Sequence, residues 1–151
     1  MPNPDAFMMA LFVRLMGPRV LSATVDPGPG NATTMLRVYA HCHPATTPGV
    51  TILLINLASE QSFSVSLGLS HSGRKAWRLE GQGGDIHAKI ATLNGAPLEL
   101  TPGARVFPAM PGVTQTSDSA VQVPPASVTF LLLSGKDAAT ACVSSQTLVT
   151  G

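Results

Sequence analysis

The chain has 151 residues, 44% of them apolar, which is the size and composition of one ordinary folded domain and excludes a disordered tail. Only 11% of the residues are charged, and nine Lys and Arg residues nearly cancel eight Asp and Glu residues, leaving a formal net charge of +1. This balance gives no support to nucleic-acid binding through a basic surface. No apolar run approaches the roughly 18 to 20 residues of a membrane-spanning helix, so we expect no transmembrane segment.

The first expected element is an α-helix over residues 5–16. Its apolar residues recur at spacings of one, three and four along one broad face: Phe7, Met8, Leu11, Phe12 and Leu15. Asp5 is the expected N-cap and Gly17 the stop signal. We do not expect a secretion signal here, because two prolines and Asp5 precede the apolar stretch, where a signal has basic residues. The helix is apolar around most of its circumference, which predicts packing against something larger.

From Met35 onward the apolar residues alternate, which predicts an antiparallel β-sandwich over residues 35–143. The first strand places Leu36, Val38, Ala40 and Cys42 inward and Arg37, Tyr39, His41 and His43 outward. The segment 50–57 is apolar on both faces, as a central strand is. Further strands are expected at 63–67, 76–79, 86–93, 98–100 and 127–133. The expected inner layer is Val38, Ile52, Leu54, Phe63, Val65, Leu79, Ile90, Phe130 and Leu132.

The connections complete the expected domain organisation. Asn94 and Gly95 predict a tight hairpin, because both central positions of a type I′ turn require positive φ. The segment 102–125 contains five prolines and is expected to be a long loop. We therefore expect a helical segment at 1–20, a Pro/Gly linker at 21–34, the sandwich at 35–143 and a frayed tail at 144–151.

The acidic residues give no catalytic pair. Glycoside hydrolysis usually requires two carboxylates about 5 to 9.5 Å apart. All eight acidic residues lie in cap, turn or strand-border contexts. Two other short patterns are also interpreted as turns: GLSHSG at 68–73 has one residue too many for a nucleophile elbow, and GQGGDI at 81–86 is not followed by a helix.

The segment His41-Cys42-His43 suggests a metal site, since residues two apart on a strand share a face. However, no third or fourth ligand is evident, and Cys42 points away from both histidines. We therefore expect exposed strand histidines, with no metal and no cofactor.

Two cysteines and one N-glycosylation sequon indicate the cellular compartment in which the protein matures. Cys42 and Cys142 can form a disulfide that closes the sandwich, and the alternative is two buried reduced thiols. Asn31 begins the sequence Asn-Ala-Thr, an N-glycosylation sequon within a Pro/Gly loop. Together these features favour an oxidising secretory compartment.

In order, several segments of this sequence resemble the C-terminal part of heparanase and its plant relatives, in glycoside hydrolase family 79. They are PNPDAFMMALFVRLMGPRVLSA, MLRVYAHC, VTILLINL, KAWRLEG, IATLNGAPLEL, PPASVTFLLLSG and TACV, and they cover nearly the whole chain from Pro2 to Val143. The resemblance is specific because LRVY-x-HC, LNG and the late cysteine keep their order and similar spacing. None of these motifs is catalytic.

The resemblance implies a (β/α)₈ barrel followed by a β-sandwich, acting as a retaining β-glucuronidase on glycans that contain glucuronic acid. Residues 1–20 then correspond to the last barrel helix, and Cys42 and Cys142 match the family's cysteine pair. The family's two catalytic glutamates belong to earlier barrel strands, so no residue here is assigned a catalytic role. The implied partners are the missing barrel and, through it, the glycan.

Two functions from different classes remain. The first is a C-terminal fragment of a heparanase-like glucuronidase, inactive alone. The second is a free secreted module that binds carbohydrate or protein. The expected location is secreted, extracellular or in the cell wall, with a lysosome-like or vacuole-like compartment and peripheral membrane association as alternatives.

Overall fold

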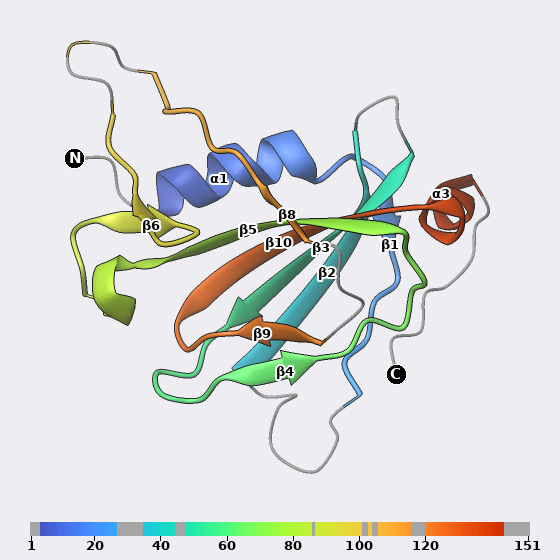
Figure 1. Ribbon diagram of the computed structural model, residues 1–151, viewed down its shortest axis with the longest axis horizontal. Coiled ribbons are helices and arrows are strands. Elements are labelled where there is room, and N and C mark those ends of the chain that lie inside the picture. Colours follow the sequence, from blue (N-terminus) through green and yellow to red (C-terminus); the bar gives the residue numbers. More distant parts are fainter. Residues whose placement is uncertain are drawn as a thin grey trace.

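The computed structural model describes residues 4–26, 35–44, 48–85, 87–100, 103, 106–115 and 120–143. These residues form a mainly antiparallel β fold with two helices, α1 at Pro4–Leu15 and α3 at Lys136–Val143, which confirms the expected fold class. Helix α1 lies on one side of the main sheet, and the short strands β4 and β9 lie on the other (Figure 1). No helix within these ranges is both long enough and apolar enough to cross a membrane.

The main sheet contains eight strands within the described residues, in the order β1-β2-β3-β10-β5-β6-β7, with β8 also paired to β5. Strand β10 is central, and each of its residues has an antiparallel partner in both β3 and β5. The strands are β1 Val20–Leu21, β2 Leu36–Cys42, β3 Gly49–Asn56, β5 Gly73–Gly81, β6 Ala91–Leu93, β7 Ala96–Pro97, β8 Val113–Gln115 and β10 Ser127–Ser134. A short 3₁₀ turn, η1 at Gln82–Gly84, follows β5.

One face of the main sheet is covered by a two-stranded sheet of β4, Phe63–Val65, and β9, Val121–Val123. Helix α3 contributes Ala138 and Ala141 to the same core. The apolar side chains of this core include Leu36, Val50, Ile52, Leu54, Phe63, Val123, Leu131 and Leu133.

The opposite face is covered by α1, whose Phe7, Leu11 and Leu15 are buried. They pack with sheet residues that alternate with the first core: Leu53, Trp77, Leu79, Leu93 and Phe130. Met110 belongs to this core as well, and its carbonyl accepts hydrogen bonds from Trp77 Nε1 at 3.0 Å and from Arg14 at 2.5 Å. The segment around Met110 therefore ties α1 to β5.

The C-terminal end of α1 is fixed to β2 and β3 through backbone carbonyls that have no partner within the helix. The Leu15 carbonyl accepts hydrogen bonds from Thr51 Oγ1 at 2.8 Å and His43 Nδ1 at 3.1 Å. The Gly17 carbonyl accepts one from His41 Nδ1 at 2.6 Å, and the Gly17 N–H donates to the Cys42 carbonyl at 3.0 Å. A side chain at position 17 would collide with that Cys42 carbonyl, so glycine is required.

The strongest sequence patterns are confirmed. The expected helix over 5–16 corresponds to α1, although Asp5 lies in its first turn and is not a separate cap. The alternating strand corresponds to β2, and the segment that is apolar on both faces corresponds to β3. The hairpin forms between β6 and β7, where Asn94 and Gly95 have φ of 51° and 85°.

Several weaker expectations are wrong. The strand expected at 86–93 covers only Ala91–Leu93, and residues 98–100 are not a strand. The expected loop at 102–125 contains β8 and β9, and α3 was not expected. Leu21, placed at the start of the linker, pairs with Ala40 in the sheet. The expected inner layer is divided, because Leu79 and Phe130 face α1 while Ile52 and Leu54 face β4 and β9.

We predict that Leu11→Ala lowers the free energy of unfolding by about 2 to 5 kcal/mol, because it leaves a cavity between α1 and the sheet. Val13→Ala is the matched control on the same helix, since Leu11 is 0% exposed and Val13 is 73% exposed. The control should change the free energy of unfolding by less than about 0.5 kcal/mol. Urea denaturation followed by circular dichroism measures both, and equal effects would contradict the packing of α1.

Thr→Val in two neighbouring strands should change the free energy of unfolding differently at the two positions. Thr51→Val removes the donor to the Leu15 carbonyl and should destabilise by about 0.5 to 1.5 kcal/mol. Thr129→Val removes a buried hydroxyl that has no hydrogen-bond partner among the described residues, and should leave the fold unchanged or more stable. Thermal and urea denaturation test both variants, and a larger loss at position 129 than at position 51 would refute the prediction.

Candidate functional site

A pocket of about 470 Å³ opens on the main sheet at the point where α1 ends. Lys75 of β5 lies opposite Leu132 of β10, which lies opposite Thr51 of β3, so these three residues share one face. Because α1 stops at Leu15 and the chain turns toward β1, this end of the face stays open. The pocket is lined by Arg14, Leu15, His43, Pro44, Lys75, Trp77 and Leu132.

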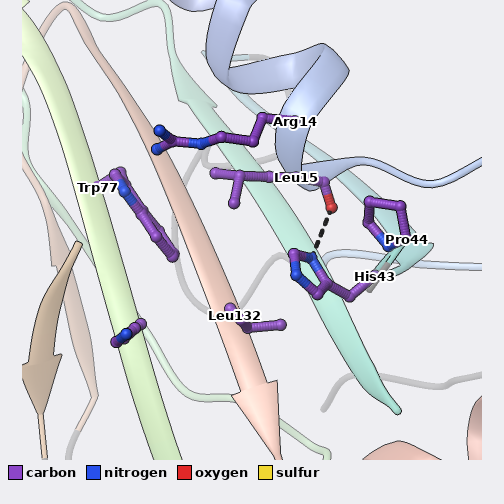
Figure 2. A pocket seen from close by; sticks show the side chains of 7 residues that line it. Arg14, Leu15, His43, Pro44, Trp77 and Leu132 are labelled. Carbon is purple, nitrogen blue, oxygen red and sulfur yellow. Dashed lines mark hydrogen bonds between the residues drawn. The ribbon is translucent and has the colours of Figure 1, made fainter. Parts of the chain in front are cut away.

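The pocket brings together three basic side chains, from α1, from β5 and from the segment that directly follows β2. Figure 2 shows Arg14 reaching from the last turn of α1 toward Trp77, while the His43 ring points back at the Leu15 carbonyl. Lys75 is exposed and makes no hydrogen bond or ion pair with any described residue. Within the part of the chain that the structure describes, no acidic residue lines the pocket, so Arg14 and Lys75 give it a local positive charge.

Each basic group keeps hydrogen-bonding capacity that the fold does not use. Arg14 donates one of its five N–H groups to the Met110 carbonyl. The Leu15 carbonyl accepts from His43 Nδ1, so in the neutral ring Nε2 is an acceptor, and the unused donors of the pocket are those of Arg14 and Lys75. The arrangement can therefore bind a small polar group without disturbing the contacts that hold α1.

The histidine pair has a structural role. His41 and His43 bind the carbonyls of Gly17 and Leu15, and the His41 ring also contacts the edge of Phe12 with centroids 5.9 Å apart. His71 bonds to the Leu69 carbonyl, and His87 is exposed in a turn. Across the described ranges, no three His, Cys, Asp or Glu residues gather closely enough to hold a metal ion.

Two carboxylates line one other pocket, but its size and contacts do not suit catalysis. Asp5 and Glu80 border a pocket of about 170 Å³, below the roughly 300 to 1,000 Å³ of usual ligand pockets. Glu80 also pairs with Arg78, with Nη2 and Oε1 3.5 Å apart. Asp118 lies outside the described residues. We therefore assign no catalytic role to the acidic residues.

The two cysteines lie at the opposite edge of the sheet from β6 and β7. In the structure a disulfide joins Cys42 at the end of β2 to Cys142 in α3, with Cα atoms 5.7 Å apart. Arg19 donates a hydrogen bond to the Cys142 carbonyl, which adds a second link between this edge and α3. The sequon at Asn31 and the expected tail at 144–151 lie outside the described residues.

The sequence interpretation missed the basic pocket. Arg14 was notable only as a single charge in an otherwise apolar helix. Lys75 and Trp77 are two apart on a strand and so share a face, which was a usable signal. What the sequence did not show is that α1 crosses this face and ends beside Lys75.

No family model matches the chain, but curated proteins do. It is 32% identical over 143 residues to baicalin-beta-D-glucuronidase of Scutellaria baicalensis, a match that covers 93% of this chain and 26% of that protein. It is 31% identical to heparanase-like protein 1 of Arabidopsis thaliana, covering 91% and 30% of the two chains. It is 27% identical to inactive heparanase-2 of Homo sapiens, covering 91% and 25%.

Among solved structures, a GH30 endoxylanase from Clostridium papyrosolvens aligns with 87% of this chain and 28% of its own, at 17% identity and a TM-score of 0.41. That likeness is too weak to define function. The sequence matches are more informative, and in them the chain spans only 25–30% of the length of the relatives. At about 30% identity over about 90% of its own length, the chain is therefore similar to one part of these glucuronidase and heparanase-like proteins, in agreement with the resemblance to glycoside hydrolase family 79.

Proposed function

We propose that this chain is the C-terminal, non-catalytic sandwich of a heparanase-like β-glucuronidase, and that it supports a catalytic (β/α)₈ barrel. The main support for the proposal is that the outer face of α1 is apolar and exposed. Met9 and Val13 lie one turn apart and are 55% and 73% exposed, while Phe7, Leu11 and Leu15 are buried against the sheet. A helix that is apolar on both sides fits a position between two layers of a larger protein.

The length of the relatives supports the same proposal. About three quarters of baicalin-beta-D-glucuronidase lies outside the region that matches this chain. In the proposed enzyme, the two catalytic carboxylates and the binding of a glucuronic-acid-containing glycan belong to that remaining part. A relative named inactive heparanase-2 shares the matched region as well, so this region is compatible with both active and inactive proteins.

The alternative is a free module that binds carbohydrate. Such modules use exposed aromatic rings as flat platforms, and the single Trp of this chain, Trp77, is 5% exposed and donates to the Met110 carbonyl. Tyr39 and Phe107 are exposed, but Tyr39 lies in β2 and Phe107 in a segment without regular secondary structure, far from it along the chain. A role in supporting the barrel therefore accounts for the exposed apolar surface of this chain better than carbohydrate binding does.

An exchange of regions tests the proposal. We expect the purified chain to release no product from an aryl glucuronide, because it lacks the two catalytic carboxylates. Replacing the matched region of baicalin-beta-D-glucuronidase by this chain should give an active hybrid. Hydrolysis by the isolated chain above a mock preparation, or a folded but inactive hybrid, would contradict the proposal.

Matched substitutions in the hybrid test the outer face of α1. Val13→Asp should lower the melting temperature and activity of the hybrid, because it places a charge between α1 and the barrel. Val143→Asp is the control, since Val143 is an exposed valine on the other helix, at 81%. Equal effects of the two substitutions would show that the outer face of α1 is not the contact.

We also propose that the protein matures in the secretory pathway, with a glycan on Asn31. The Cys42–Cys142 pairing and the sequon support this location. After secretory expression, we expect mass spectrometry of non-reduced peptides to find the two cysteines linked, and Asn31→Gln to abolish a mass decrease on deglycosylation. Free thiols or an unmodified Asn31 in the secreted protein would refute the corresponding part.

A further inference from the structure

We propose that the pocket at the end of α1, lined by Arg14, His43 and Lys75, is a binding site for an oxyanion, either a carboxylate or a sulfate group. The proposal does not depend on the family assignment. The argument rests on the charge of the pocket, on the free donors that face it and on its apolar wall.

Among the described residues, the two positive charges of the pocket have no acidic partner. Arg14 and Lys75 both line the pocket, and no acidic side chain lies among the lining residues. Two cations that line one pocket repel each other, and an anion bound in that pocket offsets the repulsion. The remaining N–H donors of Arg14 and the ammonium of Lys75 can form charge-assisted hydrogen bonds to the oxygens of one anionic group.

The elements around the pocket fix the side chains of Arg14 and His43 and the backbone of Lys75. Arg14 is fixed by its bond to the Met110 carbonyl, and His43 by its bond to the Leu15 carbonyl. Lys75 extends from β5, which is paired along its length with central strand β10. A site built on these elements is therefore largely preformed, which lowers the entropic cost of binding.

The wall of the pocket favours an anion that carries an organic body. Pro44, Trp77 and Leu132 supply apolar surface beside the charges, as Figure 2 shows. A volume of about 470 Å³ lies within the usual range for small-molecule pockets, roughly 300 to 1,000 Å³. The oxyanion would then lie at Arg14 and Lys75, with the attached body toward the apolar wall.

Titration of the full chain, followed by ¹H–¹⁵N NMR, tests the site. The probes are sodium sulfate, sodium glucuronate and glucose, each at ionic strength matched with sodium chloride. We expect saturable shifts of the Trp77 indole N–H signal with sulfate or glucuronate and none with glucose, because binding requires the negative charge. Binding of sulfate alone identifies an inorganic anion, and tighter binding of glucuronate identifies a carboxylate on an organic body. Equal shifts with glucose, or no saturable shift beyond chloride, would overturn the proposal.

Substitutions separate this site from general charge effects. Lys75→Gln should weaken anion binding at least about tenfold, while Lys89→Gln, which removes an exposed lysine outside the pocket, should leave it unchanged. Arg14→Lys keeps the positive charge but removes the guanidinium that binds the Met110 carbonyl. It therefore shows whether a change in anion binding comes from the charge or from the Met110 contact. Thermal denaturation verifies that each variant is folded. Equal weakening by Lys75→Gln and Lys89→Gln would show nonspecific attraction and would refute the site.

Discussion

The pairing of β10 along its whole length is the constraint on which the rest of the fold depends. Its eight residues bond to β3 on one side and β5 on the other, so this strand occupies the middle of the main sheet. Both β10 and β3 are apolar on their two faces, and a sheet of this kind is stable in water only if both faces are covered. Helix α1 covers one face, and β4 and β9 cover the other. The layered arrangement thus follows from two central strands.

Local sequence patterns predict those elements that carry a complete apolar period or a turn signal within their own residues. The helix, β2, β3, β10 and the Asn94-Gly95 hairpin each carry a complete period or turn signal. Strands β7, β8 and β9 have only two or three residues each. A tight turn defines β7, and pairing with strands distant along the chain defines β8 and β9. Helix α3 is formed largely by small residues and gives only a weak apolar pattern. Such elements are determined by tertiary pairing, which a short window of sequence does not contain.

The assignment of residues to layers failed for a related reason. Alternation shows that two sets of residues face opposite sides, but not which side receives a helix. Leu79 and Phe130 were therefore grouped with Ile52, although they lie beneath α1. The histidines illustrate the same limit, because their spacing suggested metal ligands. The carbonyls at the end of α1 instead use both imidazoles as donors, a role visible only once the helix is placed on the sheet.

The disulfide between Cys42 and Cys142 has a consequence for how the folded protein responds to proteases. It joins positions separated by 100 residues, so nearly every surface loop of the sandwich lies between the two linked cysteines. A single cut in any of these loops would leave both pieces covalently attached and still paired through the central strands. A nicked molecule would therefore stay in one piece under oxidising conditions, and in gel electrophoresis the two fragments would separate only after reduction.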